Sequence, residues 1–140
     1  MQYKKKLRYN VGDIIYAHSY SMKYDPQKPI SEDNFPEITK LFLIIYAENV
    51  DDSIDSSRNY LVLKLTSNME DIRKYSYIYP LSKNNFLDKQ GLVKCNKIHT
   101  IDISQIKGSV GTLDSESLKE VYKLYRSFQN KIEEQLLERV

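Results

Sequence analysis

The sequence predicts a small, mainly β domain that ends in one α-helix. Residues 41–46 are an unbroken run of apolar and aromatic residues that is too short for a membrane span and has the composition of a buried strand, and residues 60–67 form a second strongly apolar strand. After Asp114, apolar residues recur at the spacing of an amphipathic helix. A chain of 140 residues is the size of one domain with a substantial core.

Composition excludes several classes of protein. The net charge of +2 and a mean hydropathy of −0.57 are typical of a soluble protein, so we expect no membrane association. Cys95 is the only cysteine, so the chain forms no internal disulfide, which fits a reducing cytoplasm. Cys95, His18 and His99 do not have the spacing of zinc ligands, and we expect no cofactor. Gly12 and Asp13 interrupt the chain before any signal-like apolar segment, so we expect no export.

The first third of the chain combines a charged arm, a strand and a long loop. Residues 1–9 are basic with little to bury and predict a solvated tail. Turn residues at 11–13 precede a strand predicted over Asp13–Tyr20, with His18 near its end. Residues 19–38 contain three prolines and predict a loop, a candidate flap over the residue that follows it, Lys40.

The central strand is predicted over residues 39–47, and Lys40 stands directly before its apolar run. Such a lysine is either an edge residue that extends to solvent or a charge directed into a cleft. The connector at 48–59 is rich in aspartate and serine but has no glycine where a calcium loop needs one. A solvated hairpin loop is the favoured interpretation.

The strand predicted over residues 60–67 ends in two hydroxyl residues, Thr66 and Ser67. Thr66 would lie beside Lys40 if the two strands pair antiparallel with offset ends, or it makes only a local turn bond. Residues 73–79 alternate and predict a half-buried strand closed by Pro80. Its tyrosines either belong to the core or stack on nucleic-acid bases.

The last part of the chain predicts a long strand and the helix. Residues 92–103 alternate as one strand or as two joined at a bend. Asp114 is the expected helix cap, with Leu113 and Leu118 as a hydrophobic staple around it. The apolar stripe comprises Leu118, Val121, Tyr122, Tyr125, Phe128, Ile132 and Leu136. Residues 131–140 carry only a thin stripe and either project beyond the core or pair with another chain.

Six segments follow one another in a particular order along the chain. They are Val11-Gly12-Asp13-Ile14, residues 40–45, residues 62–67, Gly91-Leu92-Val93-Lys94, Ile98-His99-Thr100-Ile101-Asp102 and Gly111-Thr112-Leu113-Asp114. This order resembles the MazF/PemK family of toxin ribonucleases across most of residues 10–128. The resemblance implies a toxin domain at 10–128, which leaves the basic arm at 1–9 and a helix extension at 129–140 outside it.

The resemblance also implies a fold, partners and an activity. The family has a small antiparallel β-barrel related to SH3-like barrels, here expected with five to seven strands, and works as a homodimer. It cleaves single-stranded RNA without a metal, through the ribose 2′-hydroxyl, and is neutralised by a cognate antitoxin. We therefore expect mRNA and an antitoxin as partners, with sequence-selective cleavage.

The same resemblance implies the residues of the site. Lys40 stands where the family has a catalytic arginine, and Thr66 matches its catalytic threonine or serine. A cation can neutralise the charge of a phosphate, and a hydroxyl can fix its position by a hydrogen bond. His18 is a candidate for proton transfer near neutral pH, although a lone histidine at the end of a strand is often structural. The residues expected to contact RNA are Ser67, Tyr20, Lys64 and Arg73.

An alternative function remains open because of the lysine at position 40. The chain would then be a catalytically impaired module of the same fold that binds RNA or a protein. Gyrase-poisoning relatives use a tryptophan near the C-terminus, and this sequence contains no tryptophan.

Overall fold

The computed structural model describes residues 3–20, 37–48, 59–70, 76–81 and 90–140, and it shows a six-stranded sheet with one C-terminal helix. This confirms the predicted fold class. The elements are β1 (Asp13–Tyr20), β2 (Glu37–Ala47), β3 (Asn59–Thr66), β4 (Ile78–Pro80), β5 (Leu92–Asp102), the 3₁₀ turn η1 (Ile103–Gln105), β6 (Ile106–Thr112) and α2 (Ser115–Leu137).

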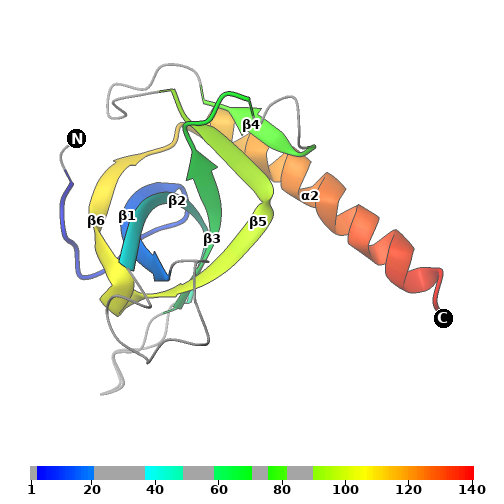
Figure 1. The fold of residues 1–140 in the computed structure, drawn as a ribbon, viewed down its shortest axis with the longest axis horizontal. Coiled ribbons are helices and arrows are strands. Elements are labelled where there is room, and N and C mark those ends of the chain that lie inside the picture. Colours follow the sequence, from blue (N-terminus) through cyan, green and yellow to red (C-terminus); the bar gives the residue numbers. More distant parts are fainter. Residues whose placement is uncertain (1–2, 21–36, 49–58, 71–75, 82–89) are drawn as a thin grey trace, which may run out of the picture.

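The sheet is antiparallel and curls strongly around its own inner face (Figure 1). Its strand order is β4-β5-β3-β2-β1-β6, so β4 and β6 are the edges and no ladder joins them among the described strands. The predicted barrel is therefore correct in strand number and direction, but the ring of hydrogen bonds is open. The chain itself spans the opening, because β5 continues through η1 into β6.

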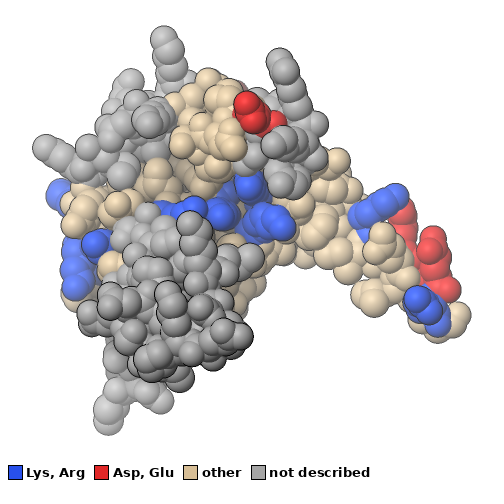
Figure 2. All heavy atoms as spheres, in the orientation of Figure 1, with Lys and Arg blue, Asp and Glu red and all other residues tan. Residues whose placement is uncertain are grey.

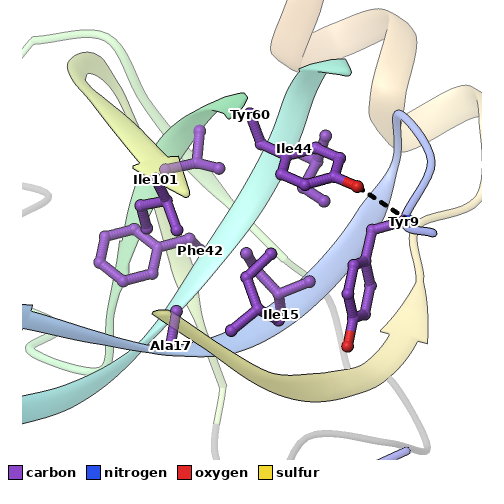
Figure 3. Packing of buried hydrophobic residues seen from close by; sticks show 9 residues of the cluster. Tyr9, Ile15, Ala17, Phe42, Ile44, Tyr60 and Ile101 are labelled. Carbon is purple, nitrogen blue, oxygen red and sulfur yellow. Dashed lines mark hydrogen bonds between the residues drawn. The ribbon is translucent and has the colours of Figure 1, made fainter. Parts of the chain in front are cut away.

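Two apolar clusters lie on the two faces of the sheet. The inner cluster fills the curl and includes Ile15, Phe42, Ile44, Tyr60 and Ile101 (Figure 3). The outer cluster, which includes Leu43, Leu63, Leu113 and Val121, packs the sheet against α2. Because successive side chains of β2 alternate between the clusters, its middle, residues 42–44, is buried on both faces, as the unbroken apolar run predicts.

The N-terminal arm packs against the sheet, which corrects the prediction of a solvated tail. Lys4 and Ser109 exchange backbone hydrogen bonds of 2.8 and 2.7 Å, so the arm pairs with part of the free edge of β6. Tyr9 is only 2% exposed, and its backbone N–H donates to the Tyr60 hydroxyl at 3.3 Å. The side chains of residues 3–8 are exposed, as their charge predicts.

The turn before β1 and the start of α2 are as predicted. Gly12 has a φ of +95°, a conformation that glycine adopts without strain. Asp13 is buried and accepts hydrogen bonds from the Asn10 backbone N–H at 2.8 Å and the Thr112 hydroxyl at 2.9 Å. Asp114 caps α2 by accepting a 3.0 Å bond from the Ser117 N–H.

Three elements differ from the sequence-based expectations. The loop expected over 19–38 overlaps two strands, because β1 continues to Tyr20 and β2 begins at Glu37. Of the strand expected over 73–79, Ile78 and Tyr79 lie in β4, and Tyr77 before them has a φ of +65° that breaks the alternation. Strand β6 was not predicted. Residues 21–36, 49–58 and 71–75 lie outside the described residues, as do the predicted flap and connector over them.

Helix α2 extends past the sheet as one continuous helix (Figure 1). All residues from 129 to 140 are exposed, and among them Ile132, Leu136 and Leu137 are large and apolar. Within this chain the segment therefore projects beyond the core, and pairing with another chain stays a prediction. The described part of the chain contains no helix that is long and apolar enough to cross a membrane.

Candidate active site

Strand register brings three lysines from three adjacent strands onto the inner face. Phe42 of β2 pairs with Lys64 of β3, and Lys64 pairs with Lys94 of β5. Lys40 lies two residues before Phe42 and therefore shares its face. All three lysines are half-buried, as expected for chains that reach from the edge of the core towards solvent.

Phe42 forms the apolar base of this site. It is 1% exposed and lies at the end of the inner cluster that is remote from Tyr9 (Figure 3). Beyond it, the inner face changes from apolar side chains to lysines. The site therefore lies where the inner cluster meets solvent.

A register shift in β5 adds a histidine and a fourth lysine. The pairing of β5 with β3 moves from Leu63 opposite Ile98 to Lys64 opposite Lys94, so Cys95, Asn96 and Lys97 form an irregularity. His99 lies opposite Val62, and its ring meets the Phe42 ring edge-on, with centroids 5.7 Å apart and planes at 69°. We call Lys40, Lys64, Lys94 and Lys97 the lysine cluster.

The electrostatics of the site are those of crowded cations. Burial lowers the pKa of Lys64, and so do the positive charges of Lys40, Lys94 and Lys97. The pKa of His99 is lowered by burial, then by the charges of Lys64 and Lys97. Among the described residues, every charge that shifts these two groups is positive. Figure 2 shows Lys and Arg side chains gathered across the middle of one face, over β3 and β5.

Thr66 lies two residues beyond Lys64 on the same face of β3. The β2–β3 register, continued by two residues, places it beside Lys40. Its hydroxyl oxygen accepts a 3.2 Å hydrogen bond from the Asn68 N–H, so the local turn bond considered from the sequence is present. The hydroxyl proton can still be donated. Ser67 follows and is exposed.

His18 is not brought together with Lys40. Ala17 pairs with Lys40, so the side chain of His18, the next residue, is on the opposite face of the sheet. The His18 carbonyl accepts a 3.3 Å bond from Gln105, which ties η1 to β1. Tyr20 pairs with Glu37 at the end of β1, but its side chain and all of Arg73 lie outside the described residues.

Asp102, in the segment that carried the family resemblance, has a structural role. Its carboxylate accepts bonds from the backbone and hydroxyl of Ser104, and the Gln105 side chain accepts from its N–H at 2.8 Å. The hydrogen bonds from Ser104 lower the pKa of Asp102. This capping box forms η1, the turn that carries β5 into β6.

Neither metal ligands nor a reactive thiol occur in the described residues. No group of three or more His, Cys, Asp or Glu side chains there could hold a metal ion. Cys95 is fully buried, and burial raises the pKa of its thiol to about 12. A thiol in that environment does not form the thiolate that a nucleophile requires.

Sequence reasoning assigned no chemical role to Lys94, Lys97 or His99. Lys94 and His99 are five residues apart, and a regular alternation would put them on opposite faces. The irregularity at 95–97 restores them to one face. The dense basic composition of residues 94–99 was the signal that could have identified them.

Comparison with known proteins gives the family. A model of the PemK-like, MazF-like toxins of type II toxin-antitoxin systems matches residues 24–128. This chain belongs to that family. No curated protein sequence is similar enough to this MazF-like chain to count as a match.

Solved structures share the fold of this MazF-like chain. One is the Mycobacterium tuberculosis toxin MazF-mt6, with a TM-score of 0.57 and 17% identity over 84% of this chain and 96% of that one. Another is an endoribonuclease in complex with its cognate antitoxin from a mycobacterial species, with a TM-score of 0.56 and 13% identity over 85% of this chain and 92% of that one. At these identities the likeness shows the fold.

Proposed function

We propose that this MazF-like chain is a toxin endoribonuclease that cleaves single-stranded RNA at the lysine cluster. The observation that carries the proposal is the convergence of Lys40, Lys64 and Lys94 from three adjacent strands at the rim of the inner cluster. The cost of crowding cations in this way is offset when an anion binds between them. RNA phosphates are such anions.

The site suits cleavage by attack of the ribose 2′-hydroxyl. That reaction must neutralise charge on the phosphoryl oxygens while the 2′ oxygen bonds to phosphorus and the 5′ oxygen leaves. Lys40 supplies a positive charge, and Thr66 supplies a hydroxyl proton that hydrogen-bonds a phosphoryl oxygen and fixes the phosphate. These steps need no metal ion.

RNA contacts extend along the rim on both sides of Thr66. Ser67, which follows Thr66, would bind the neighbouring backbone, and Lys64, on the same face of β3, would contact the RNA at the scissile phosphate itself. Tyr20 and Arg73 are proposed to contact the bases or the next phosphate. Selectivity for a base sequence then comes from unstacked bases read beside the cluster, as in other single-strand recognition.

The proposed assembly is a homodimer that a cognate antitoxin neutralises in the cytoplasm. A largely apolar cavity of about 610 Å³ lies between α2 and strands β2 and β3, and its lining includes Tyr46 and Tyr122, which are 55% and 56% exposed. Exposed aromatic surface of this kind favours a protein partner. The antitoxin complex of the mycobacterial endoribonuclease supports the second partner. If sedimentation at micromolar concentration detects only monomer, the proposal of a homodimer is wrong.

The function is tested by cleavage of a long single-stranded RNA of mixed sequence in the presence of a chelator. We expect the purified wild type to cut it and the co-expressed antitoxin to stop the reaction. Lys40→Ala and Thr66→Ala should each lower the rate by at least about a hundredfold, the usual scale for one positioned charge or donor. Unchanged melting temperatures control for folding.

Two results would contradict this proposal. Full activity in both variants would place the chemistry elsewhere on the chain. RNA binding without cleavage by the wild type would favour the alternative, a binding module of the same fold.

A further inference from the structure

The cleavage reaction needs a proton acceptor, and neither Lys40 nor Thr66 supplies one. A lysine ammonium has donors only, and a threonine hydroxyl is a very weak base near neutral pH. The attacking 2′-hydroxyl must nevertheless lose its proton, and the departing 5′ oxygen must gain one. The site therefore requires further groups.

His99 and Lys64 lie where such groups are needed. His99 on β5 is opposite Val62, and Lys64 is two residues further along β3 on the same face. The Phe42 ring is in edge contact with the His99 ring at 5.7 Å and is paired with Lys64 across the β2–β3 ladder. An imidazole and an amine thus flank one end of the inner cluster, beside Lys40.

We propose that His99 removes the proton of the ribose 2′-hydroxyl and that Lys64 protonates the departing 5′ oxygen. This assignment rests on the endoribonuclease function proposed for the lysine cluster, and it adds the acid and the base. His18, the other histidine of the chain, is on the opposite face of the sheet and is replaced by His99 in this role.

The step balances without any further reactant. The 2′ oxygen transfers its proton to a ring nitrogen of His99 and forms a bond to phosphorus. The bond from phosphorus to the 5′ oxygen breaks, and that oxygen takes a proton from the Lys64 ammonium. The products are a 2′,3′-cyclic phosphate and a 5′-hydroxyl, and proton exchange with water restores both side chains.

The surroundings favour these protonation states. Lys64 of β3 and Lys97 of β5 are the charges that act on His99, while β2 presents it with the uncharged ring of Phe42. Partial burial, and then both charges, lower the pKa of His99, so the imidazole is neutral and able to accept a proton at neutral pH. Lys40, Lys94 and Lys97 act on Lys64 in the same sense, which makes it a stronger acid than an isolated lysine.

These shifts predict the pH dependence of cleavage. The cleavage rate should rise with pH as His99 loses its proton, and the midpoint of this ascending limb should lie below 6.5, the ordinary pKa of histidine. The rate should fall again at higher pH as Lys64 loses its proton, and the midpoint of this descending limb should lie below 10.5, the ordinary pKa of lysine. The plot of kcat/KM against pH is therefore bell-shaped, and both of its limbs lie at lower pH than the ordinary pKa values of histidine and lysine would give.

The test uses the full chain and a long single-stranded RNA, with His99→Gln, Lys64→Gln and His18→Gln compared across pH. His99→Gln should lower kcat by at least about a hundredfold and remove the ascending limb, while KM changes little. Lys64→Gln should remove the descending limb. Lys123→Gln is the matched control for charge, because Lys123 is 70% exposed on α2 and pairs there with Glu120.

A second readout does not depend on activity. The imidazole of His99, followed by NMR, should titrate below 6.5 in the wild type and closer to that value in Lys64→Gln, where one of its two repelling charges is gone. A His99 pKa that does not respond to Lys64→Gln would show that the two groups are not neighbours in solution.

Several outcomes would overturn the assignment. If the wild type cleaves RNA and His99→Gln keeps both kcat and the ascending limb, His99 is not the base, although the proposed function stands. Loss of that limb in His18→Gln alone would give the role to the other histidine. A wild type that cleaves no RNA overturns the proposed function and this assignment together.

Discussion

At the scale of single residues, the proposed site depends most on the side chain at position 40. The family resemblance puts an arginine there, whose planar fork binds two phosphoryl oxygens at once. Lys40 is instead a compact charge, and it lies near enough to Lys64 in the lysine cluster to lower the pKa of that lysine. The four lysines of the cluster can together supply the positive charge at the phosphate that the guanidinium of one arginine would supply in the family.

We predict that Lys40→Arg retains RNA cleavage. If Lys40 acts as an electrostatic clamp, an arginine charge at the same position should give a rate within about tenfold of wild type, since the loss of a positioned charge costs far more. Kinetics on the same RNA, beside Lys40→Ala, provide the measurement. A Lys40→Arg variant as inactive as Lys40→Ala would instead make Lys40 a proton donor.

Sequence alone could predict part of this site. Lys40 stands directly before an uninterrupted apolar run and Thr66 directly after a strongly apolar one, so their position at the edge of a core follows from the pattern. His99 could not be placed in the same way, because its face depends on the register shift at residues 95–97. The alternation of polar and apolar residues along a strand does not predict where such an irregularity occurs.

At the scale of elements, the N-terminal arm and β6 form a unit that depends on a glycine. Gly108 lies under the arm, where an added Cβ would be 2.7 Å from the Tyr3 ring and 2.8 Å from the Lys4 carbonyl oxygen. The arm's pairing with Ser109 requires this close approach. Neither feature was predicted, because the glycines and the lysine of β6 obscure its strand pattern and the charge of the arm obscures the burial of Tyr9.

We predict that Gly108→Ala detaches the arm from the sheet. Displacing it should cost about 1–3 kcal/mol of stability, as overpacking usually does. Limited trypsin digestion should then cut faster after the arm's basic residues. Adding Tyr3→Ala should not rescue the variant, because the Lys4 backbone still blocks the methyl group. Equal digestion rates for Gly108→Ala and wild type would show that the arm does not pack on Gly108 in solution.

At the scale of the whole molecule, the curl of the sheet separates two kinds of surface. The inner face ends in the lysine cluster, where we place RNA cleavage, and the outer face carries α2 and the apolar cavity, where we place protein partners. The overall fold followed from the sequence because apolar runs and helical spacing are local signals. The open ring did not, since it depends on which edge strands fail to pair.

The central claim is that this chain cuts RNA by means of the RNA's own 2′-hydroxyl. The most direct test first maps one cleavage site on a long RNA, then compares two oligonucleotides that differ only by a 2′-deoxy substitution at the nucleotide before the cut. We predict cleavage of the all-ribose oligonucleotide to a 2′,3′-cyclic phosphate and a 5′-hydroxyl, seen by mass spectrometry, and no cleavage of the deoxy one at that position. Equal cutting of both would show that the nucleophile is not the 2′-hydroxyl and would contradict the mechanism.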